Sequence, residues 1–162
     1  MSHFFPRAEY AEDQPLARTI LATHVLSRGF QVGTAVGLLK SGAAALFKNR
    51  PITTLSLLRS ASAGGAVGTG VVGVGLIIQM WGREKIEWQD RSWRLRYNPG
   101  QLGIDNWSEP VAALGALAVA FRRPLEPTIG VWRGVVGGMG IGSLVGIVGC
   151  LCATHILLPR KE

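Results

Sequence analysis

The charged side chains most relevant to function in this sequence are arginines that lie next to apolar stretches. Arg28, Arg59 and Arg133 each stand at the start of a run of small residues. An arginine deep in hydrocarbon costs several kcal/mol even on the gentler insertion scales. We therefore expect these guanidinium groups to reach lipid headgroups or to pair inside a complex.

The histidines and cysteines inside apolar stretches are predicted to be packing residues. We expect no intramembrane Asp or Glu as a partner for His24 and His155, since Glu109 only flanks its apolar stretch; a proton pathway usually needs one, so a transport or pump role is not favoured. Cys150 and Cys152 are too few and too close for a disulfide framework or a zinc site. Buried thiols of this kind behave as small hydrophobes.

Catalytic and nucleotide-binding motifs do not emerge from the sequence. It holds no context for a Ser-His-Asp triad, no His-Glu-x-x-His and no carboxylate pair in a polar pocket. The glycine-dense stretch 134–142 could suggest a phosphate loop, but a dinucleotide fingerprint needs a preceding strand and an acidic residue about 20 residues on. We expect no catalytic residue, no metal site and no cofactor.

Composition favours helices packed closely inside a bilayer. The 162 residues include 22 glycines, about 14% against a usual share of about 7%. Charged residues make up 17%, below the usual level of about 25%, and 48% of residues are hydrophobic. This length predicts a single domain over 1–162, and glycine-rich, charge-poor chains are typical of membrane helices.

Four membrane spans are predicted, at about 16–39, 58–82, 108–122 and 129–158. Two stretches lack Asp, Glu, Lys and Arg: 23 residues from Ser60 to Gly82, and 26 residues from Gly134 to Pro159. Each exceeds the roughly 20 residues that cross a bilayer as a helix. The other two spans are weaker, and the alternative is a surface helix at 16–39 and a re-entrant or buried segment at 108–122. For the latter, Ser108 is a plausible N-cap and Pro110 suits the first turn.

Repetition along the chain favours all four spans. Three predicted helices start near a proline: Pro15, Pro51 and Pro127. Glycines recur at four-residue spacing, which places them on one helix face. We predict an all-α integral membrane protein built as two glycine-rich helical hairpins, 15–82 and 107–158, joined by a polar loop over 83–106. The predicted helix-packing residues are Gly29, Gly33, Gly37, Gly64, Gly68, Gly134, Gly138, Gly142 and Gly146.

The polar segment 83–106 carries a concentration of aromatic and basic side chains. From Arg83 to Arg96 the pattern also suits a short amphipathic helix. Tryptophan and arginine often anchor protein interfaces, so we predict that this segment docks onto a partner. The alternative is an aromatic belt lying in the lipid headgroups. The predicted docking residues are Trp88, Arg91, Trp93, Arg94 and Trp107.

The net charge of +7 gathers in the two short connections, 40–59 and 122–133. Short basic loops tend to face the cytoplasm or its mitochondrial counterpart, the matrix. Both termini and 83–106 would then lie on the opposite side. The predicted headgroup ligands are Lys40, Lys48, Arg50, Arg122 and Arg123. They suit an anionic phospholipid such as cardiolipin better than they suit nucleic acid.

Two family resemblances follow from these features. The four-span plan, with glycine ladders after arginine and an N-terminus too acidic for a presequence, resembles the mitochondrial inner-membrane translocase channel subunits. More narrowly, the stretch 87–95 (EWQDRSWRL), the 6–10 opening (PRAEY) and the 28–33 segment (RGFQVG) resemble the NUXM family of fungal complex I accessory subunits.

These resemblances imply two functions. The first is a non-catalytic accessory subunit of mitochondrial NADH:ubiquinone oxidoreductase (complex I), packed against other membrane subunits and supporting the assembly or stability of the membrane arm. The alternative is a component of an inner-membrane protein translocase or channel. A channel wall should show polar or acidic side chains along a span, so the sequence favours the first. The expected location is the mitochondrial inner membrane, with both termini in the intermembrane space.

Overall fold

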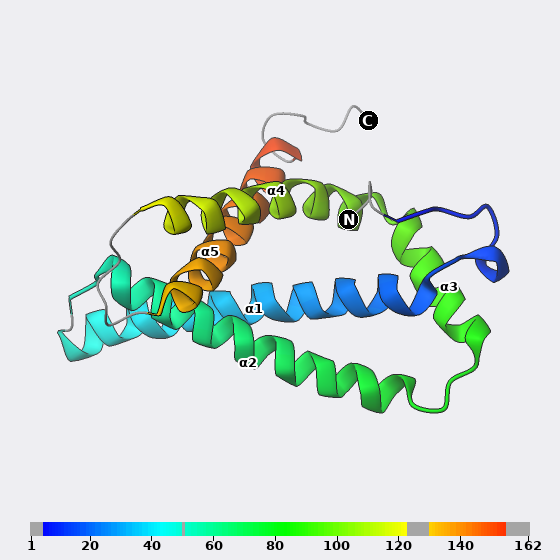
Figure 1. The fold of residues 1–162 in the computed structure, drawn as a ribbon, viewed down its shortest axis with the longest axis horizontal. Coiled ribbons are helices and arrows are strands. Elements are labelled where there is room, and N and C mark those ends of the chain that lie inside the picture. The colour runs from blue at the N-terminus through cyan, green and yellow to red at the C-terminus, as the bar shows by residue number, and fades with distance from the viewer. Residues whose placement is uncertain (1–4, 50, 123–129, 155–162) are drawn as a thin grey trace.

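The computed structural model describes residues 5–49, 51–122 and 130–154, and all regular secondary structure within these ranges is helical (Figure 1). A short 3₁₀ turn, η1 (Ala11–Asp13), precedes the helices. Five α-helices follow: α1 (Ala17–Lys48), α2 (Thr54–Met80), α3 (Lys85–Tyr97), α4 (Pro99–Phe121) and α5 (Val131–Cys152).

The first two helix starts follow prolines, as predicted. Pro15 precedes α1, whose N-cap Leu16 has a left-handed backbone (φ 53°). Pro51 precedes α2, which begins with a capping box: the Thr53 hydroxyl accepts from the Ser56 N–H, and the Thr53 N–H donates to the Ser56 hydroxyl. Reciprocal bonds of this kind satisfy N–H groups that a helix start leaves unpaired. Pro127 lies outside the described residues.

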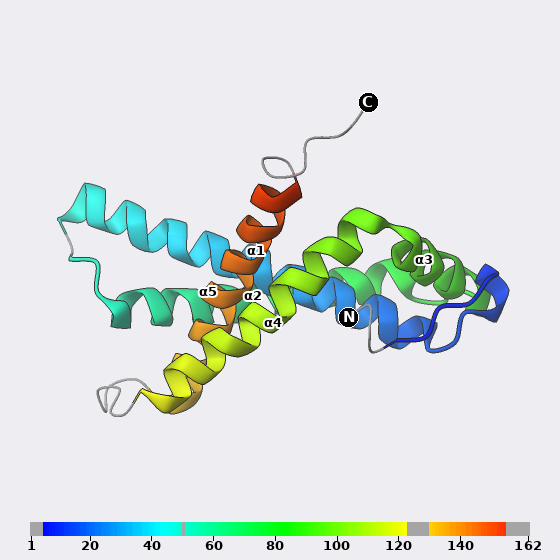
Figure 2. The same cartoon turned by 90° about the horizontal axis from the view of Figure 1, so that it is seen from above.

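The helices form two antiparallel pairs, α1 with α2 and α4 with α5 (Figures 1 and 2). Seen from above, α5 crosses the α1–α2 pair and α4 lies across α5 (Figure 2). The predicted pairing into two glycine-rich hairpins is therefore present in the structure. The connection between α1 and α2 lies at one end of the molecule, and α3 with the N-terminal segment lies at the other.

Three helices of the described chain are long and apolar enough to cross a membrane: α1, α2 and α5. The prediction of four spans is not supported, because the predicted span 108–122 is only the C-terminal part of α4. The N-terminal half of that helix adds polar side chains, among them Asp105, Asn106 and Glu109, which lower its overall apolarity.

The start of α4 also differs from the prediction. The helix begins at Pro99, with Asn98 as the N-cap: the Asn98 side-chain oxygen accepts from the Gln101 N–H. Ser108 and Pro110 lie inside the helix instead of at its start. Proline at the first helical position and Asn at the cap form an equally good start signal ten residues earlier, and this is the one the chain uses.

The prediction that residues 83–106 form a loop is wrong. The segment forms α3 and the first turns of α4. The short amphipathic helix predicted from Arg83 to Arg96 does form, from Lys85 to Tyr97, and its first turn is closed by a bond from the Glu84 N–H to the Glu87 carboxylate.

Large apolar side chains face mostly outward, and the buried interior is built from small ones. Buried residues of α5 include six glycines, together with Ser143 and Cys150. Ile20 and Leu58 are among the few large hydrophobic side chains that are fully enclosed. Such an inverted distribution suits a surrounding of lipid or other membrane subunits, where burial gives helices no hydrophobic advantage.

Candidate functional site

The α1–α2 contact is a seam of glycine backbones. A Cβ atom added at Gly33 would lie within 3.0 Å of the Gly64 carbonyl oxygen, a separation that real side chains do not reach. Gly29 faces Gly68 and Gly37 faces Ser60 in the same antiparallel register. The five glycines predicted to pack in these two helices thus meet one another across a single seam.

The α4–α5 contact is a second seam of the same kind. Gly138 lies against Gly115, Gly142 against the backbone of Val111, and Gly146 against that of Trp107. Gly134 is also buried, in the first turn of α5. Three of the four glycines predicted on α5, Gly138, Gly142 and Gly146, therefore pack against α4.

A second face of α5 joins the two hairpins, which the sequence analysis did not predict. Added Cβ atoms at Gly137 and Gly140 would collide with the Leu58 backbone and the Thr34 side chain. Gly115 on α4 was likewise missed. These glycines fall outside the four-residue ladder, and a search for small residues on two faces of α5 would have found the first two.

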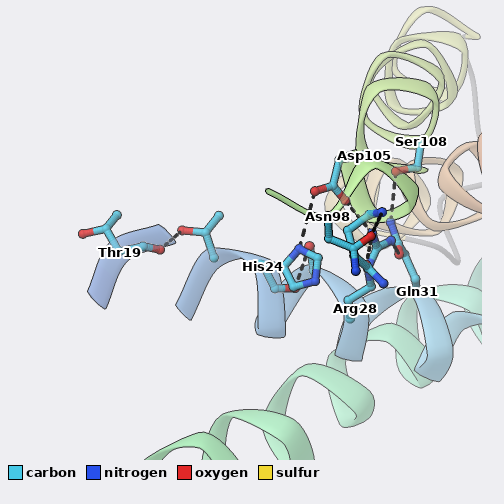
Figure 3. A network of polar contacts seen from close by, with 10 residues as sticks. Thr19, His24, Arg28, Gln31, Asn98, Asp105 and Ser108 are labelled. Atoms are coloured by element: carbon cyan, nitrogen blue, oxygen red, sulfur yellow. Dashed lines mark hydrogen bonds and ion pairs between the residues drawn. The ribbon is translucent and has the colours of Figure 1, made fainter. Parts of the chain in front are cut away.

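A buried polar cluster connects α1 to α4 beside these seams (Figure 3). The Arg28 guanidinium donates to the Asp105 carboxylate at 2.6 Å, to Gln101 at 3.0 Å and to Gln31 at 2.7 Å. Gln31 in turn donates to the Ser108 hydroxyl at 3.3 Å. The side chain of Asp105 is 6% exposed and that of Arg28 is 23% exposed, so water screens this pair weakly.

His24 completes the cluster one turn before Arg28. Its Nδ1 atom lies 3.4 Å from the second carboxylate oxygen of Asp105, and both side chains are largely buried. Asp105 lies outside all four predicted spans, yet it gives His24 and Arg28 an acidic partner that the sequence did not indicate. The sequence predicts that Asp105 lies in the polar loop. Because α4 begins at Pro99, Asp105 is instead part of this helix and its carboxylate contacts α1.

The cluster neutralises charge and ties α1 to α4. Arg28 uses three acceptors at once, and Asp105 receives an arginine on one oxygen and faces an imidazole with the other. A charge pair of this kind fixes the register of two helices, because any slide leaves a buried charge without its partner. Within the described chain, no group of three potential metal ligands occurs.

One family model matches residues 2–149, and its description is "Protein of unknown function (DUF1757)". The chain belongs to this family. No curated protein and no solved structure matches it. The match covers both glycine seams up to Gly149 and the whole polar cluster, so these features lie within the DUF1757 domain.

The three predicted docking tryptophans of this DUF1757 chain each contact another part of the same chain: the N-terminal segment, α1 or α5. The Trp93 indole N–H donates to the Glu9 carbonyl oxygen at 3.3 Å, and the Trp93 ring lies against that of Tyr97, with centroids 4.3 Å apart. The Arg18 guanidinium lies over Trp88, 5.6 Å from the ring centroid. Trp107 packs its ring near Gly149 of α5.

Further bonds from α3 hold the N-terminal segment, residues 5–14, as a clamp. The Tyr97 hydroxyl donates to the Ala8 carbonyl oxygen at 3.0 Å, and Arg96 donates to that of Phe5 at 2.6 Å. Burial lowers the pKa of Arg96, as does the charge of Arg7, while Asp105 opposes both effects. The remaining predicted docking residues, Arg91 and Arg94, are exposed, and Arg94 pairs with Asp90.

The predicted headgroup ligands that the structure describes lie at the opposite end. Lys48 ends α1 and Arg122 follows α4, and both are exposed, as is Lys40. Arg50 and Arg123 lie outside the described residues. The three described cations thus point away from the packed interior, at the end where α1 and α2 are connected (Figure 1).

Proposed function

We propose that this protein is a non-catalytic structural subunit of a larger membrane complex, and that this complex is mitochondrial complex I. The observation that carries the proposal is the pair of closed glycine seams. Each seam closes one hairpin, and the second face of α5 joins the two hairpins into one unit, whose outward faces carry large apolar side chains such as Val67, Val145 and Val148. The assignment to complex I depends on the family resemblance at 87–95.

The proposed docking surface is the part of α3 that the N-terminal segment leaves open. It comprises Ile86, Arg91 and Arg94, together with Trp81, which is 80% exposed just before α3. Tryptophan and arginine are frequent hot-spot residues. In this proposal α3 and the N-terminal segment face the intermembrane space, while the short α1–α2 connection faces the matrix.

A translocase or channel component is the second candidate, and the polar cluster is the observation that favours it. His24 and Arg28 are polar side chains along the spanning helix α1, of the kind that a channel wall requires, and Asp105 of α4 faces them. Against this candidate, the glycine seams bring backbones into contact and leave no space for water between the paired helices.

Native-gel separation of mild-detergent mitochondrial extracts, with mass spectrometry of each slice, tests the assignment. We expect the protein to comigrate with complex I. Comigration with a protein translocase would support the second candidate, and migration as a free subunit would overturn both.

A charge-reversal pair then tests the docking surface. Arg91→Glu with Arg94→Glu should shift the protein out of the large assembly, whereas Arg122→Glu, at the other end of the molecule, should leave it assembled. Normal assembly of the Arg91→Glu/Arg94→Glu variant would exclude α3 as the interface.

A further inference from the structure

A groove of about 1040 Å³ runs along the α1–α2 seam. Its floor is the glycine backbone of the seam, including Gly33, Gly37 and Gly64. Its walls carry Val32 and Val36 from α1, and Val67 and Val71 from α2, each at least 60% exposed. The glycines that let the two backbones touch also leave a trough above them, because they contribute no side chains to fill it.

Charge is distributed unevenly along this groove. Lys40, Arg59 and Arg133 line it toward the end where α1 and α2 are connected, and no Asp or Glu is among the described residues that line it. Arg28 lines the groove farther along, and its charge is matched by Asp105. The groove therefore combines a basic mouth with an apolar body.

We propose that this groove binds one anionic phospholipid, with its phosphate at Lys40 and Arg133 and an acyl chain along the four valines. From Arg59 to Val71 the helix advances about 18 Å, at about 1.5 Å per residue. This compares with about 15 Å for half of a hydrocarbon core of about 30 Å. An acyl chain is slender enough to lie on a glycine floor, and basic side chains near the membrane surface attract anionic lipids.

The inference does not depend on the proposed function, since a lipid site would serve a subunit of any membrane complex. It also differs from general headgroup attraction, because it requires a chain in the groove as well as a charge at its mouth. A helix of a partner subunit and a second copy of this chain are the competing occupants.

Native mass spectrometry of the purified, detergent-solubilised full-length protein tests the site by titration with dioleoyl phosphatidylglycerol or dioleoyl phosphatidylcholine. We expect one tightly held phosphatidylglycerol per chain, bound at least about tenfold more tightly than phosphatidylcholine, a factor equal to about 1.4 kcal/mol. Equal binding of the two lipids, or displacement of phosphatidylglycerol by inorganic phosphate, would overturn the proposal. So would a lipid-free dimer as the stable form.

Two matched pairs of variants separate the mouth from the body of the groove. Lys40→Glu should weaken phosphatidylglycerol binding about tenfold, whereas Lys85→Glu, exposed on α3 and outside the groove, should change it less than about twofold. Ala63→Trp should block the groove, while Ala66→Trp, also exposed on α2 but not lining the groove, should not. Unchanged binding in Lys40→Glu and Ala63→Trp would exclude this site.

Photo-cross-linking of the unaltered protein tests the site without relying on variants that could misfold. Phosphatidylglycerol with a photoreactive diazirine on its acyl chain should cross-link to peptides that contain Val36 or Val67. Labelling confined to other surfaces, such as the exposed face of α5 around Val148, would contradict the proposal.

Discussion

Helix α1 is held on two sides by different physical means. Toward α2 it presents Gly29, Gly33 and Gly37, and backbone meets backbone with no side chain between. Toward α4 it presents His24 and Arg28, and the two helices are joined by charge. Close packing depends on short-range dispersion and fails when bulk is added, whereas a buried ion pair fails when one charge is removed.

The largest expected effect is the loss of Asp105. Asp105→Leu leaves Arg28 buried beside an apolar neighbour, and removing one partner of a buried pair costs about 3–5 kcal/mol. The free energy of unfolding, measured by SDS titration in mixed micelles with circular dichroism as the signal, should fall by that amount. Asp90→Leu, which breaks the exposed Asp90–Arg94 pair, should cost less than about 1 kcal/mol.

A double variant sharpens this result. Arg28→Met combined with Asp105→Leu removes both charges, and replacing a whole buried pair by apolar groups is often close to neutral. We expect most of the lost stability to return. A double variant as unstable as Asp105→Leu would mean that charge pairing is not what the cluster contributes.

Adding bulk to the α1–α2 seam should have the next largest effect. Gly33→Leu places a side chain against the Gly64 backbone, which cannot rotate away, and overpacking costs about 1–3 kcal/mol. Gly42→Leu is the matched control on the same helix, because a Cβ atom at Gly42 has nothing within 4 Å. Equal losses in the same SDS titration would remove the argument for a close seam.

The N-terminal clamp should give a smaller and local effect. Tyr97→Phe removes the hydrogen bond to Ala8, a contribution of about 0.5–1.5 kcal/mol. Amide hydrogen exchange over residues 5–14 should accelerate, while exchange in α1 stays unchanged. Unaltered exchange at the N-terminal segment would show that this bond does not hold it to α3.

The smallest effect should be opposite in sign. Gly70 lies inside α2 with nothing within 4 Å of an added Cβ atom, so Gly70→Ala should raise stability by up to about 1 kcal/mol through helix propensity alone. Gly68→Ala, two residues earlier, should lower it, because its Cβ atom would meet the Gly29 carbonyl oxygen. The same sign for both would mean that position on the seam does not matter.

The hairpins and their glycine faces could be predicted because helix periodicity is a local property. Four-residue spacing places Gly29, Gly33 and Gly37 on one stripe whatever surrounds the helix, and a stripe without side chains favours close approach. The short helix α3 was predictable for the same reason. The start of α4 was not, since Asn98-Pro99 and Ser108-x-Pro110 are both good local start signals.

The sequence by itself determined that this chain forms helices that pack through glycine faces and suit a membrane. Composition and residue spacing determine these properties locally, within each helix. Only the tertiary structure decided which charges meet. Arg28 and Asp105 lie 77 positions apart, and their pairing depends on how α4 is laid across the molecule by its glycine contacts with α5. The same arrangement turned Trp93 and Tyr97 toward the chain's own N-terminal segment. Long-range pairing of this kind reflects the summed packing of several helices, which no local pattern encodes.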